Sequence, residues 1–282
     1  MALTKEQIAR YSRQLILPEI GVRGQERLLT SSALLIGAGG LGSPVALYLA
    51  AAGVGRLGIV DPEAVAPSNL HRQLLHDTPA IGRPKAHSAR ERLAALNPDV
   101  TVQAFQERVT AANALELVSG YDVVVDGSDN FPTRYLVNDA CVLAGRPLVH
   151  GGVIHLRGQV LTVLPRRSAC VRCVFPEPPR PGGIPSCQEA GVAGTAVGVI
   201  GTLMAHEALK LLAGVGEPLT DRLLIFDGHR SRMREAAVRR DPGCAVCGDA
   251  PSIRTLSGQP DETRCENVPQ AATEEDEWRA SR

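Results

Sequence analysis

Two pairs of cysteines in the second half of the chain have the spacing of a metal site. Cys170 and Cys173 form one C-x-x-C, and Cys244 and Cys247 form another. One tight turn with this spacing brings two thiolates to an ion, and two such turns supply the four sulfurs that structural zinc prefers. Prolines and glycines flank both pairs and predict turns, whereas a redox C-x-x-C opens a helix after a strand. Redox pairs and disulfides are the alternatives, and the odd total of seven cysteines disfavours disulfides.

A glycine-rich motif near the N-terminus has the spacing of a phosphate-binding loop. Gly37, Gly39 and Gly42 form a G-x-G-x-x-G, with Gly40 inside it, between an apolar run and a helical pattern. Such glycines let the backbone approach a phosphate, and the helix start offers free N–H groups to the anion. Asp61 follows the next apolar run, where an acid binds ribose hydroxyls in the Rossmann plan. The motif predicts a nucleotide site, and the alternative is a tight turn with no ligand.

Polar and cationic side chains follow the second apolar run. Asn69 and Arg72 lie in the segment SNLHRQ, and Lys85 stands at a helix start in GRPK. Cations that converge on phosphates suit phosphoryl or nucleotidyl transfer, in which negative charge builds on phosphate oxygens. Hydride transfer would instead need an apolar nicotinamide slot. The alternative is that these cations lie on solvated faces.

A third polar segment, DGSDN at residues 126–130, follows another apolar run. Ligands of open α/β sheets bind at the carboxyl ends of the strands, so a carboxylate here could hold Mg²⁺ against ATP phosphates. Asp126 also suits a helix cap or a turn, and we therefore favour Asp129 as the magnesium ligand.

The elements that must position these residues form an alternating pattern. We expect strands at 33–36, 57–60, 100–105, 123–125 and 148–149, and helices at 41–52, 84–96 and 132–144. This order predicts an α/β fold with a Rossmann-like, doubly wound, mostly parallel sheet. Helices at 4–16 and 23–30 precede it, and strands at 159–164 and 222–226 with a helix at 194–213 form an additional antiparallel C-terminal portion. We expect one enzymatic domain over 1–250, a mobile loop at 176–191, and a disordered tail over 251–282.

Composition narrows the classes of function. The 282 residues carry a net charge of +0, which gives no electrostatic footprint for nucleic acid. No apolar run reaches the ~20 residues that span a bilayer. We therefore expect a cytoplasmic protein with neither a nucleic-acid nor a membrane partner.

Taken together, these motifs resemble the MoeB/ThiF/HesA family, bacterial relatives of the ubiquitin-activating enzymes. The resemblance rests on RYSRQ at 10–14, IGAGGLG at 36–42, SNLHRQ at 68–73, GRPK at 82–85, DGSDN at 126–130, CQEAG at 187–191 and the two C-x-x-C pairs. It covers about residues 5–248 in order, and the run at 131–135 leans toward MoeB-type members, the molybdopterin-synthase adenylyltransferases.

The resemblance implies a reaction, its cofactors and its partners. Members use ATP and Mg²⁺ to adenylate the C-terminal Gly-Gly carboxylate of a small ubiquitin-like sulfur carrier of the MoaD or ThiS type. The activated carrier then receives sulfur from a separate donor, a cysteine desulfurase or a rhodanese, and becomes a thiocarboxylate. The pathways include molybdopterin, thiamine and cysteine synthesis and tRNA thiolation.

The resemblance also assigns roles to individual residues. The implied nucleotide contacts are Gly37, Gly39, Gly40, Gly42, Asp61, Ser68, Asn69, Leu70, His71, Arg72, Lys85, Asp129 and Asn130. The implied catalytic residues are Arg72, Lys85, Asp129, Arg13 and Cys187. Arg13 matches an arginine finger that reaches the ATP of a second copy, which implies a homodimer, and Cys187 matches a cysteine that can link to the carrier or carry sulfur.

Alternatives stay open at two levels. Arg13 also suits a surface salt bridge, and Cys187 also suits a free thiol without an essential role. For the whole chain, the alternatives are a Rossmann NAD-dependent oxidoreductase and a catalytically silent scaffold that binds a ubiquitin-like protein.

Overall fold

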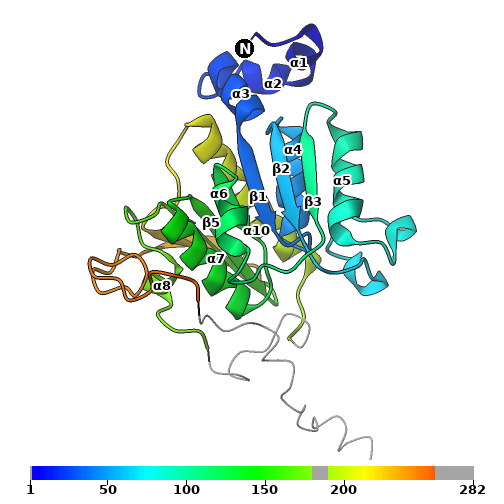
Figure 1. The fold of residues 1–282 in the computed structure, drawn as a ribbon. Helices are drawn as coiled ribbons and strands as arrows, with labels where there is room; N and C mark the ends of the chain where they lie inside the picture. The colour runs from blue at the N-terminus through cyan, green and yellow to red at the C-terminus, as the bar shows by residue number, and fades with distance from the viewer. Residues whose placement is uncertain (1, 180–189, 258–282) are drawn as a thin grey trace, which may run out of the picture.

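The computed structural model describes residues 2–179 and 190–257. Its centre is one eight-stranded sheet in the order β3-β2-β1-β4-β5-β6-β7-β8 (Figure 1). The strands are β1 Ser32–Ile36, β2 Arg56–Val60, β3 Thr101–Phe105, β4 Val123–Asp126, β5 Leu148–Ile154, β6 Arg157–Val163, β7 Arg222–Asp227 and β8 Arg232–Ala237. The pairings from β3 to β5 are parallel and those from β5 to β8 antiparallel. The predicted mixed α/β architecture is therefore confirmed.

Helices cover both faces of the sheet and enclose two apolar cores. The helices are α1 Lys5–Arg10, α2 Ser12–Leu15, α3 Gly21–Thr30, α4 Gly42–Ala51, α5 Lys85–Leu96, α6 Ala114–Ser119, α7 Phe131–Ala144, α8 Val171–Val174 and α10 Gly194–Ala213. One core lies under α3, α4, α5 and α10, and the other lies under α6 and α7. The central strands are buried along their length, as expected for parallel strands that are covered on both faces.

The two ends of the sheet have different roles. The first parallel strand leads through the glycine motif into α4, and the polar segments after β2 and β4 emerge at the same edge. The N-terminal helices α1–α3 lie beyond the opposite end of the sheet, at the amino ends of the parallel strands (Figure 1). This arrangement gathers the predicted ligand-binding segments at one edge, because the carboxyl ends of parallel strands meet there.

The helix α10 requires a correction to the sequence analysis. It is long and apolar enough to cross a membrane by length and composition, although no apolar run of that length was expected. However, 56% of its most apolar stretch is buried inside the protein. It packs on α4, β5 and β6, and Glu207 on its buried side accepts a hydrogen bond from Thr162 on β6. These contacts are those of a core helix.

Several boundaries also differ from expectation. The helix expected at 4–16 is two short helices that meet at Tyr11, whose buried ring packs between the N-terminal helices and the main body. The edge strand β8 and the short helix α6 were not expected. The packed chain also continues beyond residue 250, because Leu256 is buried in the second core and the Ile253 N–H donates to the carbonyl of Ala245.

Candidate functional site

The glycine motif forms the floor of the candidate site. Gly37 adopts φ +91°, in the region that favours glycine, and its N–H donates to the carbonyl of Val60 on β2. A Cβ on Gly42 would lie 1.9 Å from the carbonyl oxygen of Gly37, so this position admits only glycine without a backbone shift. By contrast, a Cβ on Gly39 would meet nothing closer than 3.6 Å. Gly42 thus shapes the loop, while Gly39 leaves space for a ligand.

Asp61 at the end of β2 is tied to this loop. Its carboxylate accepts hydrogen bonds of 2.8 Å from the N–H groups of Ala38 and Glu63. Burial raises the pKa of Asp61 above its usual value, while Lys85 and the two N–H groups act in the opposite direction. Asp61 therefore fixes the loop in addition to any contact with a ribose.

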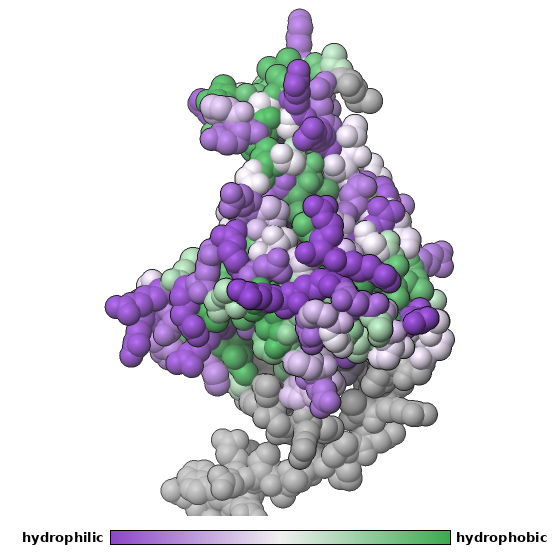
Figure 2. Space-filling view, turned by 90° about the vertical axis from the view of Figure 1, so that its left-hand side faces the viewer, coloured by the Kyte–Doolittle hydropathy of each residue, from purple (hydrophilic) through white to green (hydrophobic). Residues whose placement is uncertain are grey.

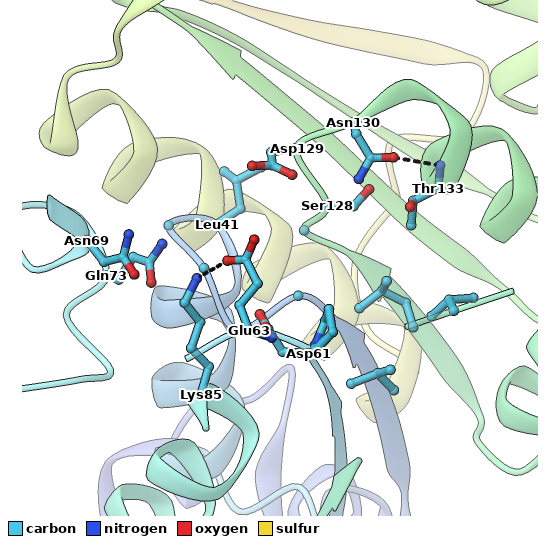
Figure 3. Close-up of a pocket in the computed structure, with 18 of the residues that line it drawn as sticks. Leu41, Asp61, Glu63, Asn69, Gln73, Lys85, Ser128, Asp129, Asn130 and Thr133 are labelled. Atoms are coloured by element: carbon cyan, nitrogen blue, oxygen red, sulfur yellow. Dashed lines mark hydrogen bonds and ion pairs between the residues drawn. The ribbon is translucent and has the colours of Figure 1, made fainter. Parts of the chain in front are cut away.

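A cavity of about 1040 Å³, open solvent included, lies above the loop at the carboxyl edge of the sheet (Figure 3). Among the predicted site residues, those that line it are Gly37, Gly39, Gly40, Asp61, Asn69, Arg72, Lys85, Asp129 and Asn130. Ser68, Leu70 and His71 belong to the same segment but do not line the cavity, and Gly42 lies beneath it. Segments separated by almost a hundred residues therefore meet around one space.

Lys85 is the most buried cation of the site. Its side chain is only 3% exposed, and its Nζ lies 2.5 Å from a carboxylate oxygen of Glu63, whose side chain is 60% exposed (Figure 3). A buried ammonium needs a partner because desolvation disfavours its charge. Glu63 also lines the cavity, so a bound anion and Glu63 would compete for the same ammonium.

The segment after β2 positions an amide and a guanidinium beside the glycine loop. Asn69 accepts a hydrogen bond from the N–H of Ala66 and thereby closes a short 3₁₀ turn, Pro67–Asn69. The Arg72 guanidinium donates to the Ser68 carbonyl and contacts His71, and its stem would meet a Cβ on Gly40 at 3.6 Å. Since these contacts leave Arg72 lining the cavity, its charge is available to a ligand.

The two carboxylates of the segment after β4 have different environments, one buried and one exposed. Asp126 is fully buried and accepts hydrogen bonds from Ser128 and from Nδ1 of His150. Burial acts to raise its pKa, but His150 and Arg134 outweigh burial and leave the pKa below the usual value. Asp129 is exposed at the cavity, and Asn130 caps α7 by accepting from the Thr133 N–H. The exposed carboxylate of Asp129 suits Mg²⁺, which is held by one or two carboxylates together with substrate phosphates.

Sequence reasoning missed several residues of the cavity. Glu63 lines it outside every predicted motif, Gln73 lines it as the last residue of SNLHRQ although it was given no role, and Arg134 lines it from α7. His76 lies behind the loop, where its Nε2 donates to the Ala38 carbonyl and its Nδ1 accepts from Ser88. Position next to Asp61 and Arg72 was the only available signal for the first two.

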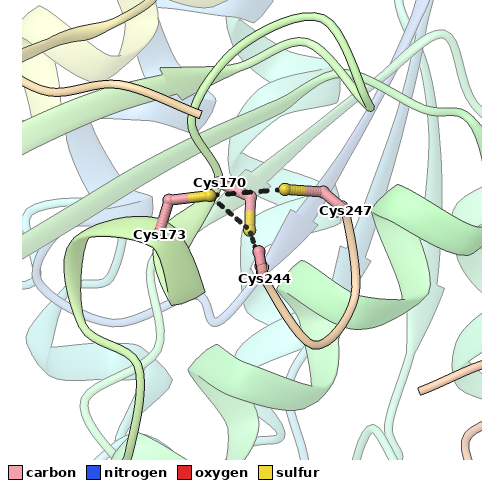
Figure 4. A group of neighbouring side chains, drawn as sticks. All are labelled: Cys170, Cys173, Cys244 and Cys247. Carbon is pink, nitrogen blue, oxygen red and sulfur yellow. Dashed lines mark hydrogen bonds between the residues drawn. The ribbon is translucent and has the colours of Figure 1, made fainter. Parts of the chain in front are cut away.

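The four cysteines predicted to bind zinc converge (Figure 4). All their sulfurs lie within 4.8 Å of one another, with separations of 3.8 Å for Cys170–Cys173, 3.7 Å for Cys170–Cys244 and 3.3 Å for Cys173–Cys247. Tetrahedral zinc with bonds of about 2.3 Å would separate its sulfurs by about 3.8 Å, so the cluster fits this ion. Hydrogen bonds from Cys170 and Cys247 lower the pKa of Cys173, which favours a thiolate. Cys170 directly precedes the short helix α8 and Cys173 lies within it, so the first pair does not lie wholly in a turn.

The two remaining predicted residues lie away from the cavity or outside the described chain. Arg13 is exposed on α2, and α2 lies beyond the edge of the sheet opposite the cavity (Figure 1). Cys187 lies outside the described residues, and its role stays a prediction.

Comparison with known proteins agrees with this geometry. Residues 11–246 match the ThiF family. The chain is 54% identical over 261 residues to a sulfur carrier protein adenylyltransferase of Thermus thermophilus, covering 91% of this chain and 96% of that protein. It is 50% identical over 256 residues to the pig adenylyltransferase and sulfurtransferase MOCS3, covering 90% of this chain but only 56% of that protein.

A solved structure supports the fold. The crystal structure of Escherichia coli MccB with succinimide superposes with a TM-score of 0.74 at 22% identity, covering 87% of this chain and 75% of that one. With the family match over residues 11–246 and the cavity built from its motifs, the chain belongs to the ThiF family.

Proposed function

We propose that the protein is an ATP-dependent adenylyltransferase that activates the C-terminal Gly-Gly carboxylate of a ubiquitin-like sulfur carrier. The observation that carries the proposal is the set of glycines, cations and carboxylates around one cavity. The similarity to sulfur carrier protein adenylyltransferases supports the choice of substrate. The product would enter molybdopterin, thiamine or tRNA-thiolation chemistry after sulfur transfer from a separate donor protein, and we place the enzyme in the cytoplasm.

In this reaction a carrier carboxylate oxygen attacks the α-phosphorus of ATP. The bond from that phosphorus to the bridging oxygen breaks, and pyrophosphate leaves with the electron pair. The backbone around Gly39 would bind the phosphates, Asp61 the ribose, and Arg72 and Lys85 the negative charge that grows in the transition state. Asp129 would hold Mg²⁺, which neutralises phosphate charge when bound, and the zinc would have a structural role only.

The alternatives fit the cavity less well. A nicotinamide enzyme needs an apolar slot for the ring, whereas this cavity presents Arg72, Lys85 and Asp129 together. A silent scaffold gives no reason for a buried lysine beside a glycine loop.

The test is the exchange of labelled pyrophosphate into ATP. We expect exchange only when a carrier ending in Gly-Gly is present, and a carrier shortened by those glycines should support none. Arg72→Ala should reduce the rate by about 10²–10³ with little change in carrier affinity. Arg90→Ala, on the exposed side of α5, is the matched control and should have no effect. Exchange without any carrier would refute the proposal.

We further propose a homodimer in which Arg13 completes the site of the second copy. The N-terminal segment carries exposed apolar side chains, with Ile16 69% and Leu17 45% exposed after α2 and Val22 55% exposed on α3. Figure 2 shows apolar surface over these helices. Such a surface next to Arg13 is typical of an interface between subunits.

Mixing two inactive variants tests this arrangement. Arg13→Ala and Lys85→Ala proteins should each be inactive, and random pairing should restore about a quarter of wild-type exchange, since half of the dimers would carry one intact site. A mixture with no recovered activity, in dimers shown to exchange subunits, would refute the shared site.

A further inference from the structure

The arginine that we assign to the site of the second copy has no partner within its own chain. Arg13 is exposed on α2 and makes no hydrogen bond or ion pair with residues 2–179 and 190–257, the part of the chain that the structure describes. Its guanidinium can reach a ligand reproducibly only if the backbone that carries it is held in place. The helix α2 has four residues, and so short a helix is not stable by itself. Its position must therefore come from contacts with the main body.

Tyr11, directly before α2, supplies the first of these contacts. It is 2% exposed, and its hydroxyl donates to Asp99 at 3.1 Å and accepts from the side-chain amide of Asn97 at 2.8 Å. The same amide nitrogen donates to the carbonyl of Ala50 in the last turn of α4. A Cβ on Gly53, just after α4, would lie 2.6 Å from the ring, so the ring packs directly on this backbone. Tyr11 thus joins the start of α2 to the carboxyl ends of α4 and α5.

Gln14, the residue after Arg13, supplies the second contact. Its amide nitrogen donates to Oε1 of Gln25 at 2.8 Å and to the carbonyl of Ala52 at 3.1 Å. Gln25 on α3 is fully buried and donates to the same carbonyl at 3.0 Å. Tyr11 and Gln14 are three residues apart and share the side of the segment that contacts the main body, whereas Arg13 between them is exposed. The two side chains therefore hold the backbone on both sides of Arg13.

We propose that Tyr11 and Gln14 are positioning residues that hold Arg13 where it reaches the nucleotide of the second copy. Both contacts end at the carboxyl end of α4, the helix that begins at the glycine motif. This helix of 10 residues is about 15 Å long, and it fixes Arg13 relative to the glycine loop of its own chain. Across a two-fold axis, the same contacts fix Arg13 relative to the glycine loop of the second copy. The inference rests on the proposed homodimer.

The first test removes one hydroxyl group and compares it with a matched one. Tyr11→Phe keeps the ring on Gly53 but loses both hydrogen bonds, and we expect pyrophosphate exchange to fall about tenfold, since a misplacement of about 1 Å can cost a factor of about 10². Tyr121→Phe is the control, because Tyr121 is 4% exposed and its hydroxyl donates to Gln103 at 2.7 Å. The control should lose a similar amount of melting temperature and no exchange. Equal exchange by the two variants would refute the positioning role.

The second test determines which copy needs Tyr11. A heterodimer of one Tyr11→Phe chain and one Lys85→Ala chain, purified through two different tags, has one cavity with Lys85, and that cavity receives Arg13 from the chain with native Tyr11. We expect about half of wild-type exchange, which is about five times the activity of the Tyr11→Phe homodimer. If Tyr11 served only its own chain, the heterodimer would have half the activity of that homodimer, and the proposal would be wrong. Gln14→Leu in place of Tyr11→Phe should show the same recovery, and its absence would remove Gln14 from the proposal.

A reference heterodimer separates this inference from the proposed function. One Arg13→Ala chain paired with one Lys85→Ala chain should have about half of wild-type exchange if Arg13 acts on the second copy. Chains that form no heterodimer, or a reference heterodimer without activity, would refute the proposed shared site. An active reference together with no recovery in the Tyr11→Phe heterodimer would refute only the positioning role of Tyr11.

Discussion

The same substitution at two positions of the glycine loop should have opposite consequences. In Gly42→Ala the new Cβ would lie 1.9 Å from the carbonyl oxygen of Gly37, far inside the optimal contact of about 3.5 Å. The backbone has no flexible side chain to move there, so the turn between β1 and α4 must shift. Overpacking of this kind costs about 1–3 kcal/mol, which lowers the melting temperature by about 2–4 °C per kcal/mol in a chain of this size. Gly39→Ala meets nothing closer than 3.6 Å and should fold normally, but its methyl group would occupy the space of the phosphates.

Two measurements on each variant distinguish these effects. Thermal unfolding without ligand should show a loss for Gly42→Ala and none for Gly39→Ala. Calorimetry with an ATP analogue should show weaker binding for Gly39→Ala, by at least tenfold, in a fully folded protein. Equal stability of the two variants would refute the packing role of Gly42. Unchanged affinity in Gly39→Ala would refute the placement of the phosphates over this loop.

Three other features lead to predictions. Cys244→Ser should release about one zinc per chain and lower the melting temperature, whereas Cys141→Ser, in the buried core, should keep its zinc. Metal analysis of the two variants tests this difference, and a metal-free wild-type protein would contradict the zinc site. Glu63→Gln should tighten ATP binding several-fold by removing the competitor for Lys85, and weaker binding would show instead that Glu63 contacts the ligand. Burial lowers the pKa of His76 in the folded protein below the ordinary histidine value of about 6.5. The folded state therefore keeps His76 neutral, and this contributes stability that is fully present above about pH 6.5. The contribution is lost as the pH falls from about 6.5 toward the lowered pKa, because the unfolded chain then binds a proton that the folded protein does not. Melting temperatures from pH 7.5 to 5.0 should show this loss in the wild type and a smaller one in His76→Gln.

The elements that position the site could be predicted because their signals are local. The run before Gly37 and the helical pattern after Gly42 define the strand, turn and helix without knowledge of the rest of the chain. The role of the cysteine pairs could also be predicted, because the C-x-x-C spacing within each pair left only a metal site, a redox pair or a disulfide to choose from. The strand β8 was missed because its residues are mostly exposed at the edge of the sheet and do not alternate in polarity.

The roles of individual polar residues depended on contacts that no spacing encodes. Asp61 was expected to bind a ribose, and the structure also gives it two hydrogen bonds that fix the glycine loop. Asp126 and Asp129 are three residues apart, and the sequence favoured Asp129 as the metal ligand and a cap or turn role for Asp126. The hydrogen bond from His150, on the neighbouring strand β5, which makes Asp126 a buried structural group, was not predictable from spacing.

The buried lysine of the cavity is explained best by an anionic ligand. The ammonium of Lys85 is buried and is neutralised by a carboxylate that is itself mostly exposed. Burial of this charge costs stability in the empty protein, and the ion pair is not needed to hold the glycine loop, because the loop is already fixed by Asp61 and His76. A phosphate would satisfy the lysine. The cost in the empty protein would then be returned as binding energy, which is the physical reason to expect that a substitution of Lys85 changes affinity more than stability.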